Sequence, residues 1–151
     1  MKKMKIMLVD DEERFLSTTK KLVERKGYEV LTATSGTEAL EKLKNYSVHI
    51  VILDVKMPGL DGVATLKEIK RLFPVVEVIM LTGHATVESA VDGLKSGAFD
   101  YVMKPCDIND LLQKATEAFE KREKLEEKIR MAQARSYMKS PREILKQGKE
   151  D

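Results

Sequence analysis

Cysteine, tryptophan and long apolar runs are scarce in this chain. A single cysteine, Cys106, and no tryptophan occur among its 151 residues. One cysteine excludes an internal disulfide and fits a reducing compartment. The longest apolar runs are far shorter than the about 20 residues that a membrane-spanning helix needs. The N-terminal MKKMKIMLVDDEE also lacks the apolar core of a signal peptide. We therefore expect a cytoplasmic protein with no membrane segment.

An excess of either charge is also lacking. Lysine and arginine total 27, and aspartate and glutamate total 25, so the net charge is only +2. Mixed runs such as EKREKLEEK are typical of solvated helix faces, and we expect no direct binding to nucleic acid. The hydrophobic fraction of 42% is enough for a core, and the length fits one domain with an appendage.

Short apolar runs alternate with segments of helical periodicity along the chain. The predicted strands are residues 5–9, 28–33, 49–53, 76–81 and 99–103. Several of them are almost continuously apolar, as strands of a parallel sheet covered on both faces must be. The segments between them carry apolar residues three and four positions apart, which is typical of amphipathic helices. This alternation predicts an α/β fold with a five-stranded parallel sheet and right-handed crossovers.

Four of the five predicted strands end in a charged or hydroxyl-bearing residue, and these residues are Asp10 with Asp11, Asp54, Thr82 and Lys104. Chemistry in parallel sheets collects at the carboxyl ends of the strands. Three carboxylates brought together there repel one another unless a cation offsets their charge. Oxygen ligands without histidine or cysteine suit Mg²⁺ rather than Zn²⁺. We therefore predict a Mg²⁺ site at this edge.

Asp54 is the candidate reacting group of the same edge. A carboxylate beside Mg²⁺ can accept a phosphoryl group as an acyl phosphate, and Mg²⁺, Lys104 and Thr82 would neutralise the phosphoryl oxygens. Each residue alone has an ordinary alternative, because an aspartate after a strand is commonly a turn or cap residue. The prediction depends on all of these residues lying at one edge of the sheet.

Lys56, two residues after Asp54, separates two functions that share this chemistry. A Mg²⁺-dependent phosphohydrolase with an aspartyl-phosphate intermediate typically has a general acid at that place, and here the residue is a lysine. We therefore expect a phosphorylation-controlled binding module and not an enzyme that turns over a separate substrate. A scaffold that works without phosphorylation is a third alternative, which the intact acidic set disfavours.

Four short stretches, LVDDE, ILDVKMPGLDG, MLTGHA and YVMKP, resemble the receiver domain of two-component response regulators. The resemblance covers residues 4–122, and the motifs are most similar to those of receivers of enhancer-binding transcriptional activators. It implies a flavodoxin-like (βα)5 fold with strand order 2-1-3-4-5. It also implies that Asp54 is the phospho-acceptor and that Asp10 and Asp11 hold Mg²⁺, together with the backbone carbonyl of Lys56.

The resemblance further implies a phosphorylation switch. Lys104 would be the lysine of the family pattern, joined to Pro105 by a cis peptide bond. Thr82 would move toward the phosphoryl group, Tyr101 would turn into the vacated space, and the face formed by the fourth helix, fifth strand and fifth helix would change. Lys56 and His84 would tune the lifetime of the acyl phosphate.

A sensor histidine kinase or phosphotransfer protein is the implied phosphoryl donor, and the output target is unknown. We expect the donor to meet the first helix, near Arg14, Phe15 and Thr18. His49, inside a predicted strand, is expected to be a packing or surface residue.

Apolar residues three and four positions apart continue from Ile108 to Ala132, with Arg122 in the one heptad position that is not apolar. We expect the fifth helix to outlast the domain, residues 123–138 to form a coiled coil or linker, and residues 139–151 to be a disordered polar tail. The heptad predicts a homodimer through this helix, with a single solvated helix as the alternative. A stand-alone receiver and a fragment of a larger regulator both fit.

Overall fold

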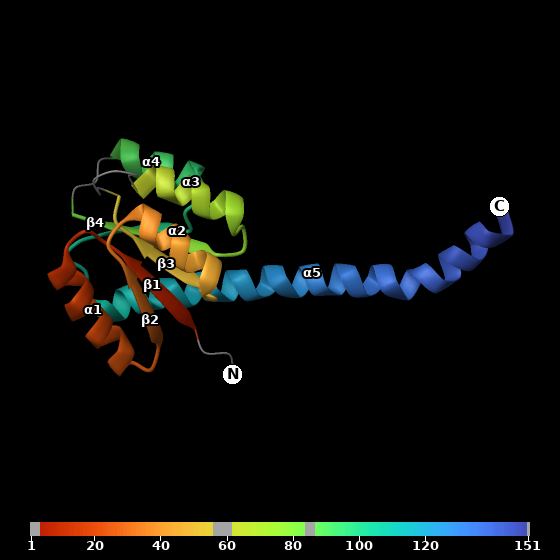
Figure 1. Ribbon diagram of the computed structural model, residues 1–151, viewed down its shortest axis with the longest axis horizontal. Helices are drawn as coiled ribbons and strands as arrows, with labels where there is room; N and C mark the ends of the chain where they lie inside the picture. The colour runs from red at the N-terminus through yellow and green to blue at the C-terminus, as the bar shows by residue number, and fades with distance from the viewer. Residues whose placement is uncertain (1–3, 56–61, 84–86, 151) are drawn as a thin grey trace.

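The computed structural model describes residues 4–55, 62–83 and 87–150, with side chains to residue 136 apart from those of residues 87 and 89. A central sheet has helices on both faces, and one helix extends far beyond it (Figure 1). The strands are β1 Lys5–Val9, β2 Glu29–Ala33, β3 Ile50–Leu53, β4 Glu77–Thr82 and β5 Asp100–Met103. Their order is β2-β1-β3-β4-β5 and all neighbouring pairs are parallel. The predicted flavodoxin-like fold is confirmed.

Each face of the sheet has its own apolar core, because alternate strand residues point to opposite faces. The helices are α1 Glu13–Arg25, α2 Gly36–Asn45, α3 Gly62–Leu72, α4 Val87–Lys95 and α5 Ile108–Glu150. One core joins strand residues such as Met7 and Val51 to buried residues of α2 and α3. The other joins Ile6 and Ile50 to buried residues of α1 and α5. This double coverage explains why the strands are almost continuously apolar.

The first part of α5 covers the sheet, and the rest projects away from it (Figure 1). Leu111, Ala115 and Ala118 are buried in the core of the α1 face. The first half of the predicted heptad therefore packs on this chain's own sheet rather than on a second helix. Beyond the sheet the apolar stripe continues into solvent at Leu125 and Ile129, which are 39% and 42% exposed.

The C-terminal segment differs from the sequence prediction. A disordered tail was predicted for residues 139–151, but α5 continues to Glu150. Lysine, glutamate, leucine and glutamine, which have high helix propensity, make up seven of these thirteen residues and favour the helix, against the low propensity of Pro141 and Gly148. In the described ranges, no helix combines the length and the apolar character that crossing a membrane requires.

Candidate functional site

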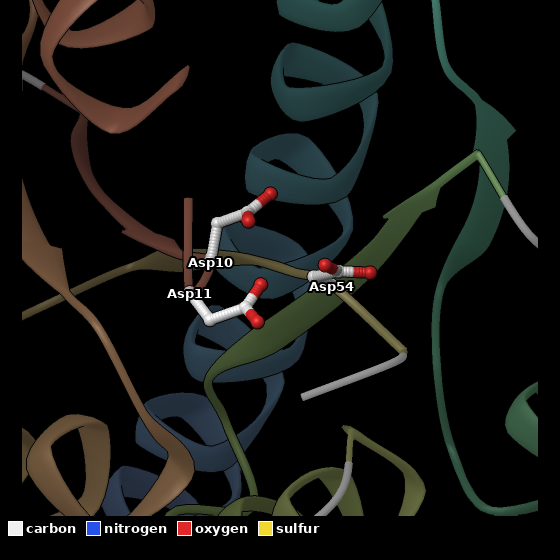
Figure 2. Close-up of side chains that lie close together, drawn as sticks. All are labelled: Asp10, Asp11 and Asp54. Carbon is white, nitrogen blue, oxygen red and sulfur yellow. The ribbon is translucent and has the colours of Figure 1, made fainter. Parts of the chain in front are cut away.

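Asp10 and Asp54 stand side by side because they follow paired ends of adjacent strands. Val9 and Leu53 are partners in the register of β1 and β3, and the Asp54 N–H donates to the Val9 carbonyl at 2.9 Å. Asp10, Asp11 and Asp54 each offer a carboxylate oxygen, and these oxygens lie within 4.8 Å of one another (Figure 2). Asp10 and Asp54 are buried and Asp11 is exposed. The predicted acidic cluster is thus assembled at the predicted edge.

Lys104 is the cation that the structure places at this cluster. Its Nζ donates to Asp10 Oδ2 at 2.5 Å and lies 3.8 Å from Glu12 Oε1. The ammonium also lies 4.0 Å from the centre of the Phe15 ring, which is a favourable cation–π position. Even with this pairing, carboxylates outnumber ammonium groups among the described residues of the cluster. A divalent cation would offset that excess.

Thr82 and Lys104 are linked through the backbone at the ends of β4 and β5. Thr82 is the last residue of β4 and is fully buried, and its carbonyl accepts the Lys104 N–H at 3.0 Å. The Lys104–Pro105 peptide bond is cis, as the family resemblance implies. The hydroxyl-bearing residue and the lysine therefore reach the edge on neighbouring strands, as predicted.

Tyr101 lies in β5 with its ring partly buried against the core of the α2 and α3 face. Burial raises the pKa of its phenol above the ordinary value. The Tyr101 hydroxyl donates to Met103 Sδ at 3.3 Å. In the register of β4 and β5, Tyr101 pairs with Met80, two residues before Thr82. The two predicted switch residues thus lie on adjacent strands.

Gly62, the first residue of α3, contacts the backbone of the candidate acceptor. Its N–H donates to the Val55 carbonyl at 3.0 Å. A Cβ atom at this position would lie 2.4 Å from both the Asp54 carbonyl oxygen and the Val55 Cα. Only glycine permits so close an approach. The sequence analysis did not predict this contact between Gly62 and the acceptor backbone. The Asp-Gly pair in GLDG, which is typical of a turn, is the sequence feature that could have indicated it.

Lys56 and His84 lie outside the described residues, so the carbonyl ligand and the lifetime roles remain predictions. His49 lies at the opposite end of the sheet and is a packing residue, as expected. Its Nδ1 accepts the Lys5 N–H at 2.9 Å, and its ring meets the Phe119 ring edge-on at 5.1 Å.

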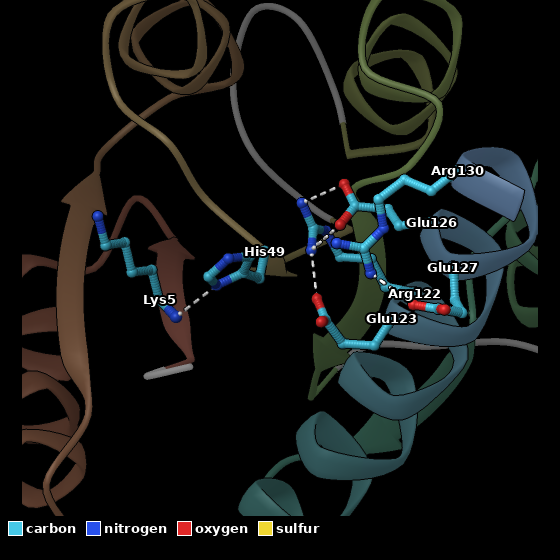
Figure 3. Close-up of polar contacts among 7 residues, drawn as sticks. All are labelled: Lys5, His49, Arg122, Glu123, Glu126, Glu127 and Arg130. Atoms are coloured by element: carbon cyan, nitrogen blue, oxygen red, sulfur yellow. Dashed lines mark hydrogen bonds and ion pairs between the residues drawn. The ribbon is translucent and has the colours of Figure 1, made fainter. Parts of the chain in front are cut away.

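A second polar cluster, which the sequence prediction missed, surrounds Arg122 where α5 leaves the sheet (Figure 3). Arg122 is buried, with 8% of the residue exposed. It donates to Glu123 at 2.9 Å and to Glu126 at 3.0 Å. Burial and the nearby Arg122 charge lower the pKa of His49. Glu123 and Glu126 both belong to α5, so these ion pairs lie within the helix and hold the buried arginine in place where α5 leaves the sheet.

The fold and the site together define an α/β protein whose carboxylates and lysine meet at the carboxyl ends of a parallel sheet. Comparison with known proteins identifies its family. The family model described as response regulator receiver domain matches residues 6–116, so the chain belongs to this family of two-component signalling proteins. The sequence-based resemblance is confirmed.

Relatives of known name cover most of this chain. The transcriptional regulatory protein ZraR of Escherichia coli (strain K12) is 42% identical over 106 residues, which are 70% of this chain and 24% of ZraR. The C4-dicarboxylate transport transcriptional regulatory protein DctD of Rhizobium meliloti (strain 1021) is 37% identical over 117 residues, 78% of this chain and 25% of DctD.

A solved receiver domain protein (CheY-like) from Methanospirillum hungatei JF-1 shares the fold with a TM-score of 0.78 at 36% identity. The match covers 82% of this chain and 98% of that one. By contrast, the chain spans about a quarter of the length of the two curated relatives. The similarity therefore describes the receiver portion that these proteins share.

Proposed function

We propose that Asp54 accepts a phosphoryl group from a sensor histidine kinase or phosphotransfer protein. The observation that carries this proposal is the meeting of Asp10, Asp11 and Asp54 within 4.8 Å, with the Lys104 ammonium on Asp10. A carboxylate oxygen of Asp54 would attack phosphorus, the bond from phosphorus to the donor nitrogen would break, and an acyl phosphate would remain. The chain would then be a cytoplasmic signalling module that turns over no separate substrate.

A hard divalent cation fits the cluster because every donor is a carboxylate oxygen. Asp10, Asp11 and Asp54 would hold Mg²⁺, with the Lys56 backbone carbonyl as a further ligand. Bound there, Mg²⁺ would offset the charge of the phosphoryl oxygens. Lys104, already held at the cluster by Asp10, would stabilise another of these oxygens. Thr82 would donate its hydroxyl to a third.

The proposed output is a change in the surface formed by α4, β5 and α5. Acyl phosphate formation adds negative charge and acceptor oxygens at the sheet edge. Thr82 would move toward these oxygens and Tyr101 would turn toward the space that Thr82 leaves. Support comes from the neighbouring positions of the two residues on β4 and β5.

The donor protein is proposed to dock beside α1. A cavity of about 690 Å³ lies between α1 and the segment after β5, and Phe15, Thr18, Lys104 and Pro105 are among its lining residues. Because Lys104 belongs to both the cavity and the acidic cluster, a side chain entering from this side would approach the acceptor region. This position agrees with the predicted contact of the first helix.

A homodimer through α5 is proposed from the exposed stripe at Leu125 and Ile129. A second copy would bury these residues as a helical pair. Sedimentation over a range of concentrations tests this, with Leu125→Ser expected to lower the dimer fraction. The matched control is Met131→Ser, because Met131 is also exposed on α5 but lies on another face. A mass that stays monomeric at every concentration, with and without beryllofluoride, would refute the dimer.

Mass measurement after incubation with acetyl phosphate and Mg²⁺ tests the central proposal. The wild-type chain should gain one phosphoryl group, and Asp54→Asn should gain none. Asp92→Asn, which removes an exposed carboxylate from α4, should gain as much as wild type. Chelation of Mg²⁺ should stop the reaction. Equal gain in Asp54→Asn, or no gain from either acetyl phosphate or a phosphohistidine donor, would refute the proposal.

A further inference from the structure

Met103, the last residue of β5, lies beside both residues of the proposed switch. The Tyr101 hydroxyl donates to its Sδ at 3.3 Å, and the register of β4 and β5 pairs Met103 with Thr82. Tyr101 and Met103 are two residues apart in one strand and so share a face of the sheet. Met103 therefore borders the region through which the two switch side chains would move.

The thioether of Met103 is open to reagents in solution, because the residue is 49% exposed. A thioether sulfur is a weak hydrogen-bond acceptor, so the bond from Tyr101 restrains the ring only slightly. Oxidation to the sulfoxide converts this apolar side chain into a polar one. The sulfoxide oxygen is a much stronger acceptor, and it would be formed on the atom that already receives the Tyr101 hydroxyl.

We propose that Met103 is a reversible oxidation site whose sulfoxide holds Tyr101 in its present orientation and so opposes the phosphorylation switch. The signalling consequence rests on the proposed function of Asp54, whereas the oxidation and its effect on Tyr101 do not. Hydrogen peroxide is the oxidant. Its O–O bond breaks, one oxygen forms a bond to sulfur, and the other leaves as water, so that sulfur is oxidised and the peroxide is reduced.

Burial limits the reaction to Met103 and Met131 among the methionines whose side chains the structure describes. Met4, Met7 and Met80 are buried in the two cores, where peroxide has little access. Met131 is 52% exposed on the projecting part of α5. It offers a matched control, because it has the same chemistry and exposure as Met103 but lies far from Tyr101 along the chain.

The first experiment treats the full chain with hydrogen peroxide without any phosphoryl donor. Peptide mass mapping locates the sulfoxides, and NMR of 13C-labelled tyrosine rings reports on Tyr101, assigned with Tyr101→Phe. Oxidation should shift the Tyr101 signal in wild type and in Met131→Leu, but not in Met103→Leu. Methionine sulfoxide reductase should reverse the shift. An unchanged Tyr101 signal in oxidised wild type would overturn the proposal.

The second experiment titrates beryllofluoride into oxidised and reduced Met131→Leu while following Tyr101. One strengthened hydrogen bond should raise the half-saturating concentration roughly three- to tenfold on oxidation, with no change in Met103→Leu. Equal half-saturating concentrations for the oxidised and reduced chains would overturn the proposal that the sulfoxide opposes the switch. A reduced chain in which beryllofluoride leaves Tyr101 unmoved counts against the proposed function instead, because the first experiment tests the oxidation site without phosphorylation.

Discussion

Replacement of Gly62 by alanine should damage both the stability and the chemistry of this receiver. The added Cβ would lie 2.4 Å from the Asp54 carbonyl oxygen and the Val55 Cα. Ordinary contacts at such an atom begin at 3.4 Å, so the start of α3 and the Asp54 backbone must separate by about 1 Å, the difference between these distances. Both obstructing atoms belong to the backbone and cannot move aside by a rotamer change.

The size of the effect follows from opposing contributions. Overpacking of this kind costs about 1–3 kcal/mol, while alanine in a helix is favoured over glycine by at most about 1 kcal/mol. We expect the free energy of unfolding to fall by about 1–2 kcal/mol. A reacting group misplaced by about 1 Å can lose about a hundredfold in rate, so phosphorylation by acetyl phosphate should slow by about that factor.

Gly93→Ala is the matched control, because that glycine is also helical. Its Cβ would lie 1.9 Å from the Cε and 2.3 Å from the Sδ of Met80, but these atoms end a flexible side chain that can change rotamer, whereas the backbone atoms facing Gly62 cannot. Urea denaturation should show a smaller loss for Gly93→Ala than for Gly62→Ala, and the rate of acetyl phosphate labelling should stay near the wild-type value. Gly62→Ala with wild-type stability and wild-type labelling rate would refute the reasoning.

Three further predictions concern pH, charge and metal. In the folded chain, burial and then the Arg122 charge lower the pKa of His49 below its ordinary value of 6.5. Between these two pKa values the unfolded chain therefore binds more protons at His49 than the folded chain does. The contribution of neutral His49 to the free energy of unfolding is present above about pH 6.5 and is lost as the pH falls through the folded pKa. Urea titrations in which His49→Gln shows the same pH dependence of stability as wild type would contradict this. Arg122→Ala should lower the free energy of unfolding by about 1–3 kcal/mol, because it removes the hydrogen-bond donor of Glu123 and Glu126 and the packing of the arginine stem. Arg122→Met should cost less than half as much stability, because it keeps the side-chain volume and removes a buried Nε that has no hydrogen-bond partner. Equal losses of stability for the two variants in thermal unfolding would refute this. Mg²⁺ at about a hundredfold excess over its Kd should stabilise wild type by about 2.7 kcal/mol but stabilise Asp11→Asn far less in urea titrations.

Much of the fold could be read from the chain because both faces of the sheet are covered. That coverage requires nearly continuous apolar strands such as HIVIL, and each predicted strand was found within one residue of its observed ends. The heptad of α5 was harder to interpret. One apolar stripe serves the core at Leu111 and Ala115 and is exposed at Leu125, and spacing alone does not reveal where the sheet ends.

The sequence by itself determined that Asp10, Asp11, Asp54, Thr82 and Lys104 arrive at one edge, because parallel strands place their carboxyl ends together. Only the tertiary structure decided how these residues meet. The pairing of Lys104 with Asp10 joins residues 94 positions apart, and the contact of Gly62 with Asp54 depends on where α3 packs. Periodicity specifies which face a residue occupies, whereas distances between side chains depend on how whole elements pack.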